Sequence, residues 1–152
     1  MAPKLKIIPL GGLGEIGKNI TALEFGKDIL LIDCGMGFPE DDMYGVDIVI
    51  PDFTYLENLM KNLPEGVEKT IVVMHVPPFD LEFNNNVANV FQLYLKEFPG
   101  LLCCLNGHAH RYLVHEPYSD GIPYIQTPCA KSREYLLFTI NEEGYEHEVI
   151  HY

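Results

Sequence analysis

The segment Thr70–Met74 constrains the fold most, because it is a continuous apolar run of the length of a strand. A strand without polar alternation lies centrally in a sheet, with both of its faces covered. The run ends at His75-Val76-Pro77-Pro78, where two prolines prevent the strand from continuing. We therefore expect an α/β protein with a histidine at the end of a buried strand. Ligands usually bind at such strand ends in α/β sheets.

Further strands are expected on both sides of this segment. Each is a short run of apolar and β-branched residues bounded by Gly, Pro or Asp. The second and third runs are separated only by Gly26-Lys27-Asp28, which predicts a hairpin. The expected strands are residues 5–10, 20–25, 29–33, 46–50, 101–105, 112–115, 122–126, 135–140 and 145–150.

Two segments have the periodicity of amphipathic helices. The first begins at Thr54, since Thr54 and Glu57 have the spacing of a capping box. The second follows three asparagines at 84–86, whose amides can cap a first turn, and ends at Pro99-Gly100. The apolar stripe of the first helix is Leu56, Leu59, Met60 and Leu63, and that of the second is Val87, Val90, Phe91, Tyr94 and Phe98.

Length and composition favour one acidic domain, residues 1–152. The net charge is −12, and the two halves of the chain contribute equally to it. This charge argues against a nucleic-acid partner, because binding a phosphate backbone depends on Lys and Arg. The four cysteines lack C-x-x-C spacing, so we expect no disulfide framework and a cytoplasmic protein. No apolar stretch reaches the length that spans a bilayer, so no membrane partner is expected.

The first half resembles the start of ribonuclease J, a nuclease of the metallo-β-lactamase fold. Three motifs carry the resemblance: IIPLGGLGEIGKN at 7–19, LLIDCGMGFPEDD at 30–42 and GVDIVIPDFTYLEN at 45–58. In that family the next strand ends in a His-x-His-x-Asp-His cluster that binds two zinc ions. Here the strand ends at His75-Val76-Pro77-Pro78 instead.

From that point the chain resembles the C-terminal half of a calcineurin-like metallophosphoesterase. The resemblance rests on order: an apolar strand, His-x-Pro-Pro, a helix, a second apolar strand, and Asn106-Gly107-His108-Ala109-His110. It implies that His75 and His108 bind one metal ion and that His110 binds another. The chain is therefore interpreted as a chimera, natural or engineered, of residues 1–66 and 67–152.

The two resemblances together imply a four-layer α/β/β/α sandwich. Both families pack two sheets face to face and place helices outside them. If each half keeps its layer, two mixed sheets would form, with one helix on each outer face.

Several parts of a phosphoesterase site have no counterpart here. That family supplies Asp-x-His, Gly-Asp and Gly-Asn-His-Glu motifs earlier in its chain, and none occurs in this sequence. His75, His108 and His110 could therefore hold one zinc or manganese ion at most, or could be a purely structural remnant. The carboxylates that could complete a site from the first half are Asp33, Asp41, Asp42 and Asp47.

Two functions remain open, and no catalytic residue is assigned. The first is a chimeric fold with little or no catalysis and a residual metal site. The alternative is a metal-dependent phosphoesterase that hydrolyses phosphodiesters or phosphomonoesters. We also expect a homodimer, because each half has lost the partner that covered it in its parent family.

Overall fold

The computed structural model describes residues 4–11, 19–26, 28–37, 50–51, 53–63 and 65–152. Most of the expected strands and both helices are present. Of the expected strand at 46–50, only Ile50 is among the described residues. The elements are β1 (Leu5–Gly11), β2 (Asn19–Phe25), β3 (Asp28–Gly37), β4 (Ile50–Pro51), α1 (Phe53–Lys61), β5 (Lys69–Met74), α2 (Ala88–Lys96), β6 (Leu101–Asn106), β7 (Leu113–His115), β8 (Tyr124–Gln126), the 3-10 turn η1 (Ala130–Ser132), β9 (Glu134–Ile140) and β10 (Tyr145–His151).

One mixed sheet joins the two halves of the chain. Its strand order is β1-β2-β3-β5-β6-β8-β7, and β4 pairs with β3 beside this path. β1, β2 and β3 are antiparallel, whereas β3, β5, β6 and β8 run parallel. The predicted hairpin at Gly26 is confirmed, because Phe25 pairs with Asp28 and Gly26 takes a φ of 67°. A residue without a Cβ adopts that left-handed conformation at little cost.

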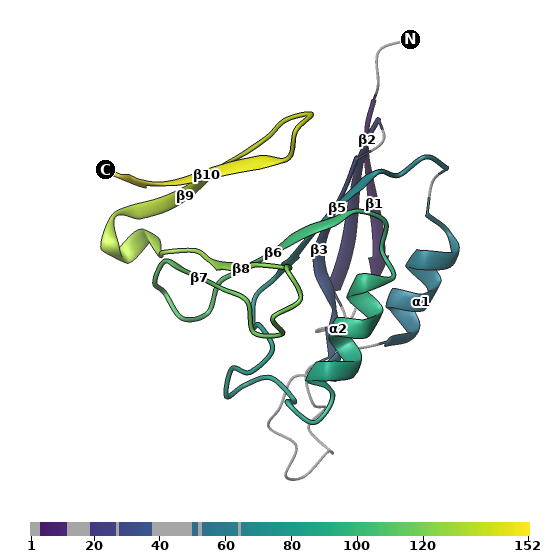
Figure 1. Ribbon diagram of the computed structural model, residues 1–152, viewed down its shortest axis with the longest axis horizontal. Coiled ribbons are helices and arrows are strands. Elements are labelled where there is room, and N and C mark those ends of the chain that lie inside the picture. The colour runs from purple at the N-terminus through teal and green to yellow at the C-terminus, as the bar shows by residue number, and fades with distance from the viewer. Residues whose placement is uncertain (1–3, 12–18, 27, 38–49, 52, 64) are drawn as a thin grey trace.

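Both helices lie on the same face of this sheet (Figure 1). The expected arrangement, with one helix on each outer face of a four-layer sandwich, is therefore not confirmed. The cause is the order of the parallel strands. The chain moves from β3 through α1 to β5, and then through α2 to β6, in the same direction across the sheet. Parallel crossovers are almost always right-handed, so two successive ones in one direction place both helices on one face.

The helix face holds the larger apolar core. Leu56 of α1 and Phe91 and Leu95 of α2 are fully buried there. The predicted stripe of α2 is partly wrong, because Val90 is 45% exposed and Leu95 takes its place in the core. The strand residues in this core are Ala22, Leu31, Val72, Met74, Cys104 and Tyr124.

The structure contradicts the capping prediction for α2, whereas the capping box of Thr54 and Glu57 stays a prediction. α1 begins at Phe53, one residue before Thr54. Glu57 accepts a hydrogen bond from the Tyr94 hydroxyl at 2.8 Å and pairs with Lys61 at 3.6 Å. The residue before α2 is Val87, which makes no side-chain cap hydrogen bond. Glu57 therefore links the two helices, and the side chains of Asn84 and Asn85 form hydrogen bonds within the preceding loop.

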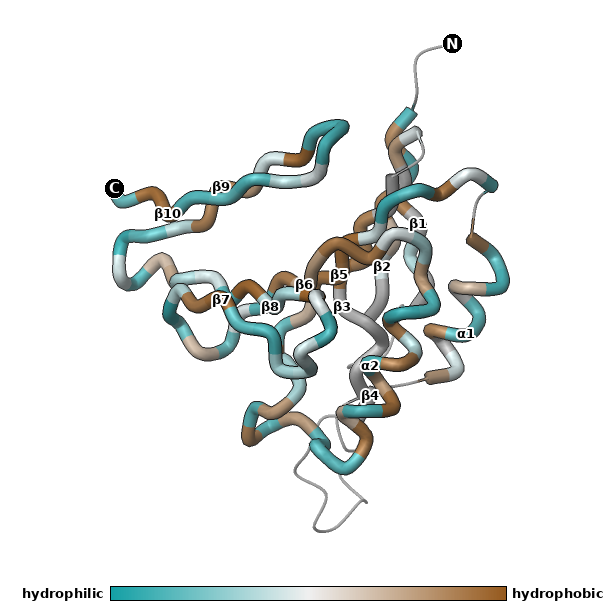
Figure 2. The backbone as a smooth tube through the Cα atoms, in the orientation of Figure 1, coloured by the Kyte–Doolittle hydropathy of each residue, from teal (hydrophilic) through white to brown (hydrophobic). Residues whose placement is uncertain are grey.

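The opposite face is covered in part by the antiparallel hairpin β9–β10. Leu136, Phe138 and Tyr145 of this hairpin pack against a small cluster of Ile71, Cys103 and Ile125. Hydrophobic residues are concentrated along β5 and β6, whereas hydrophobic and hydrophilic residues are mixed along the hairpin (Figure 2). The structure thus has three layers: helices, large sheet and hairpin.

The tip of the hairpin is attached to the start of β5. Lys69 Nζ donates to the carbonyl oxygens of Asn141 at 2.9 Å and Glu142 at 2.6 Å. Between this tip and strands β1 to β3 lies a cavity of about 830 Å³, lined by side chains that include Leu23 and Leu30. Among the described helices, none is long and apolar enough to cross a membrane.

Candidate metal-binding site

The ends of β5 and β6 bring two of the predicted histidines together. Met74 pairs with Asn106 at the last position of the two parallel strands. His75 and the Gly107-His108 turn therefore leave the sheet side by side. The Gly107 amide donates to the His75 carbonyl oxygen at 3.2 Å. The rings of His75 and His108 meet edge to face, with centroids 5.4 Å apart and planes at 88°.

Gly107 lies close to the His75 ring. A Cβ atom at this position would lie 3.3 Å from His75 Nδ1, which is a tight contact. A side chain at position 107 would require the exposed His75 ring to shift by a few tenths of an ångström.

The three predicted ligands differ in their surroundings. The His108 side chain is 24% exposed, whereas His75 and His110 are exposed residues. In the described part of the chain, no group of three or more His, Cys, Asp or Glu side chains is arranged to hold a metal ion. The structure thus places His75 beside His108, and the role of all three as ligands stays a prediction.

Two carboxylates that the sequence reasoning missed lie beside His108. Asp80 Oδ1 is 3.4 Å from His108 Nε2, and Glu82 Oε1 is 3.8 Å from the same nitrogen. The Asp80 side chain is 20% exposed and that of Glu82 is 62% exposed. The four carboxylates that were expected to complete the site cannot be compared with this arrangement. The structure describes the backbone of Asp33 but not its side chain, and Asp41, Asp42 and Asp47 lie outside the described residues.

The loop that carries Asp80 is held by hydrogen bonds. Asn85 Nδ2 donates to the Asp80 carbonyl oxygen at 2.8 Å, and Asn85 Oδ1 accepts from the Phe79 amide at 2.6 Å. The Asp80 amide donates to the Pro77 carbonyl oxygen, and Asp80 Oδ1 accepts from the Glu82 amide at 3.1 Å. A Pro-Pro-x-Asp sequence after a strand is a turn signal that could have pointed to Asp80.

Three of the five non-glycine residues with a positive φ in the described part of the chain lie near the same strand ends. Phe79, His108 and His110 have φ angles of 69°, 66° and 54°, and the other two are Ser119 and Arg133. Residues with a Cβ rarely occupy this left-handed region, and it costs them on the order of 1–3 kcal/mol. Part of the backbone strain therefore lies in the two loops that carry His108, His110 and Asp80.

Two buried amide side chains lie at the neighbouring strand ends. Asn106 is 2% exposed and Gln126 is 6% exposed, and these residues pair across β6 and β8. Both Asn106 side-chain polar atoms and Gln126 Oε1 lack a hydrogen-bond partner in the structure. Buried polar atoms usually find a protein or water partner, so this edge of the sheet has hydrogen-bonding capacity that the described protein groups do not satisfy.

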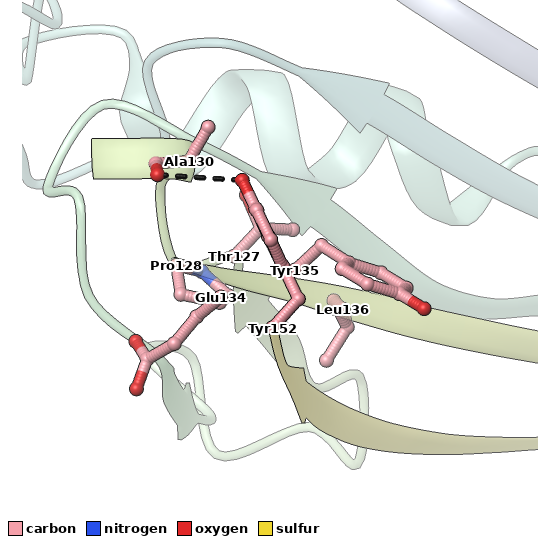
Figure 3. Close-up of a pocket in the computed structure, with 7 residues that line it drawn as sticks. All are labelled: Thr127, Pro128, Ala130, Glu134, Tyr135, Leu136 and Tyr152. Atoms are coloured by element: carbon pink, nitrogen blue, oxygen red, sulfur yellow. Dashed lines mark hydrogen bonds between the residues drawn. The ribbon is translucent and has the colours of Figure 1, made fainter. Parts of the chain in front are cut away.

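A separate hollow lies beside η1 and the start of β9. It has a volume of about 620 Å³, and its wall includes Glu134, Tyr135 and Tyr152 (Figure 3). Tyr152 closes one side by donating its hydroxyl to the Ala130 carbonyl oxygen at 3.4 Å. None of the predicted ligands lines this hollow, so it does not belong to the site at the strand ends.

Comparisons with known proteins find relatives for part of the chain. Ribonuclease J from Synechocystis is 51% identical over 71 residues, which are 47% of this chain and 10% of that protein. Ribonuclease J from Helicobacter pylori is 54% identical over 55 residues, which are 36% of this chain and 8% of that protein. Ribonuclease J 2 from Staphylococcus aureus is 53% identical over 58 residues, which are 38% of this chain and 10% of that protein.

No protein-family model matches the chain. The chain spans about a tenth of the length of these curated relatives. The resemblance to ribonuclease J is therefore confirmed as a partial similarity. This chain shares a segment of its sequence with ribonuclease J, an enzyme of the metallo-β-lactamase fold.

Proposed function

We propose that this protein is a chimeric fold derived from two metallohydrolases, which binds one divalent cation and has little or no catalytic activity. The observation that carries the proposal is the contact between His75 and His108, whose rings lie 5.4 Å apart at the ends of adjacent parallel strands. The similarity to ribonuclease J supports a hydrolase origin for the first part. The second part has a metallophosphoesterase-like order of motifs, and this supports its origin in a different family.

The donor groups at the strand ends are of the chemical kinds that a borderline cation accepts, although they are not grouped as a finished metal site among the described residues. Zinc accepts imidazole nitrogens and carboxylate oxygens as ligands, and manganese accepts the same groups less strongly. His75 and His108 would hold the ion, with His110 or water in a further position. Bound there, the ion would supply Lewis acidity. The histidines would orient it at the edge of the sheet.

Weak or absent catalysis follows from the groups that this site lacks. Phosphoester hydrolysis needs a nucleophile, positive charge near the developing oxyanion, and an acid for the leaving group. The phosphoesterase motifs that supply the bridging carboxylate and the acid do not occur in this sequence. A second cation would also need carboxylates between the two metals. Losing one metal and one general acid should lower the rate by several orders of magnitude.

Zinc titration into chelator-treated protein, followed by calorimetry, tests the cation site. We expect one ion per chain, and we expect His75→Ala and His108→Ala each to weaken binding by on the order of 100-fold. His151→Ala is the matched control, because His151 Nδ1 also lies beside a carboxylate, 3.2 Å from Glu134 Oε1. His151 ends β10 and is not at the ends of β5 and β6. Unchanged affinity in both site variants would refute the proposal.

The alternative is a working metal-dependent phosphoesterase. The specific observation in its favour is that carboxylates do lie beside His108, from the second half itself. An activated aryl phosphodiester incubated with manganese-loaded protein tests it, because a good leaving group needs little acid assistance. Metal-dependent turnover that His75→Ala abolishes would establish the phosphoesterase and overturn the inactive chimera.

Three further expectations belong to this proposal. The net charge of −12 speaks against an RNA partner. Cys103 and Cys129 are free thiols, which suits a reducing cytoplasm. A homodimer would cover apolar side chains of β1 and β2 that are exposed in the single chain, such as Ile7 and Phe25.

A further inference from the structure

The hollow beside η1 and the start of β9 has two tyrosine rings in its wall. Tyr135 and Tyr152 both line it, with ring centroids 6.1 Å apart and planes tilted by 44° (Figure 3). Its volume of about 620 Å³ lies within the range of small-molecule sites. Tyr135 is 47% exposed and Tyr152 is 65% exposed. The two rings therefore offer aromatic surface to a ligand that arrives from solvent.

The backbone that carries the two rings is held by the fold. The Tyr152 amide donates to the Arg133 carbonyl oxygen at 3.0 Å, and the Tyr152 hydroxyl donates to the Ala130 carbonyl oxygen at 3.4 Å. Tyr135 pairs with Ile150 across the β9–β10 hairpin. Both tyrosines are thus placed before a ligand binds, which lowers the cost of ordering them.

The wall also contains a carboxylate, that of Glu134. Ser132 Oγ lies 3.1 Å from Glu134 Oε2, and His151 Nδ1 lies 3.2 Å from Glu134 Oε1. No Lys or Arg is among the described residues that line the hollow. Lys131 and Arg133 lie in the same segment, but both are exposed, so water and salt screen their charges. The net charge of −12 adds a long-range attraction for cations.

Aromatic faces beside a carboxylate are the groups that recognise an organic cation. The face of an aromatic ring carries negative partial charge and attracts a cation within about 6 Å of the ring centroid. Quaternary ammonium groups are bound in this way, because their methyl groups also suit apolar surface. Pro128 and Leu136 supply apolar surface to the same wall. The hollow thus combines the surfaces that a trimethylammonium group requires.

We propose that this hollow binds a quaternary ammonium group, with the rings of Tyr135 and Tyr152 against its methyl groups and Glu134 as the counter-charge. Choline and the side chain of a trimethylated lysine share this chemistry. The inference is independent of the cation site at the strand ends, because none of the histidines predicted as ligands lines this hollow.

An NMR titration of the full-length protein with choline tests the proposal. We expect choline to shift the resonances of Tyr135 and Tyr152. Neohexanol, in which a carbon atom replaces the charged nitrogen of choline, should bind about 5–10-fold more weakly, because it lacks the attraction to two aromatic faces. A peptide with one trimethyllysine distinguishes the source. Tighter binding than choline would support a protein side chain as the ligand, and weaker binding would support a free compound.

Four variants separate the aromatic faces from general packing. Tyr135→Phe keeps the ring and should keep the affinity for choline, whereas Tyr135→Leu should lower it about 2–5-fold. Tyr112→Leu is the matched control, because Tyr112 is 45% exposed and does not line the hollow. Glu134→Gln should weaken the binding of choline and leave that of neohexanol unchanged.

Three results would overturn the proposal. Equal affinities for choline and neohexanol would show that the hollow takes apolar groups regardless of charge. Equal affinities for choline in Tyr135→Leu and the wild type would remove the role of the aromatic face. The absence of choline-dependent shifts at Tyr135 and Tyr152 would remove the site itself.

Discussion

The two faces of the large sheet are closed to different degrees. On the helix face, α1 and α2 cover the strands, and residues such as Leu31, Val72 and Phe91 are fully buried. On the other face, the hairpin β9–β10 covers the region of β6 and β8, while Ile7 of β1 is 66% exposed and Phe25 of β2 is 50% exposed. Two crossover helices close a face more completely than one two-stranded hairpin does. Stability should therefore come mainly from the helix face.

The largest expected effect is the loss of a side chain from the helix-face core. Phe91 is fully buried between α2 and the sheet, so Phe91→Ala should lower the free energy of unfolding by about 3–5 kcal/mol. Urea unfolding measures this change. The matched control is Leu93→Ala on the same helix, where the side chain is 64% exposed and the change should stay within about 0.5 kcal/mol.

A smaller effect is expected on the hairpin face. Phe138 stacks on Tyr145 with ring centroids 4.8 Å apart, but it is only half-buried. Phe138→Ala should therefore cost about 1–2 kcal/mol. If urea unfolding gave the same loss for Phe138→Ala as for Phe91→Ala, the difference between the two faces would disappear.

The sequence predicted the local elements better than their arrangement. The run Thr70–Met74 did form a central strand, and the turn at Gly26 did form a hairpin. Periodicity identifies the apolar side of a helix but does not say which sheet face it will cover. That choice depended on strand order, which placed α1 and α2 on one face.

The sequence likewise predicted the candidate site only where the site depends on strand order. Chain order brought His75 and His108 to adjacent strand ends, because parallel neighbours end at the same edge of a sheet. Asp80 was missed because its position depends on the conformation of a loop. That loop is set by Asn85, in an asparagine cluster that we had expected to cap α2.

The hairpin face should also make stability depend on alkaline pH. Burial raises the pKa of the Cys103 thiol to about 12, although a hydrogen bond with Tyr145 lowers it. An unfolded cysteine ionises near a pKa of about 8.5. Between these two values unfolding releases a proton, so the free energy of unfolding should fall as pH rises.

Urea unfolding between about pH 8 and pH 10 checks this sign. Cys103→Ala should show a shallower fall than the wild type. Cys129→Ala is the control, since the Ser132 amide and other nearby groups lower the pKa of that thiol, and this variant should retain the fall. Identical slopes in the wild type and Cys103→Ala would contradict the burial argument.

The smallest effect on stability is expected on the part of the hairpin face that β9–β10 does not cover, which we call the open face. It is formed by exposed residues of β1 and β2, such as Ile7 and Phe25. Ile7→Lys should change the free energy of unfolding by no more than about 0.5 kcal/mol, because Ile7 is 66% exposed. The Ile7→Lys substitution should nevertheless dissociate a homodimer whose interface includes this face, because it introduces a charge there. Light scattering should give twice 17.2 kDa for the wild type and 17.2 kDa for the variant.

A matched variant locates the dimer contact. Leu81 is 96% exposed and lies in the loop after β5, on neither β1 nor β2. Leu81→Lys should leave the dimer intact. A wild-type protein that remains at 17.2 kDa at high concentration would show that the open face has no second copy on it.

The most direct test of the cation site is anomalous X-ray diffraction, at the zinc absorption edge, from crystals grown with zinc. We expect one strong peak per chain at the ends of β5 and β6, with imidazole nitrogens of His75 and His108 at about 2.0–2.1 Å from the ion. A peak at another place, such as His151 and Glu134, or no peak at the strand ends, would contradict the account.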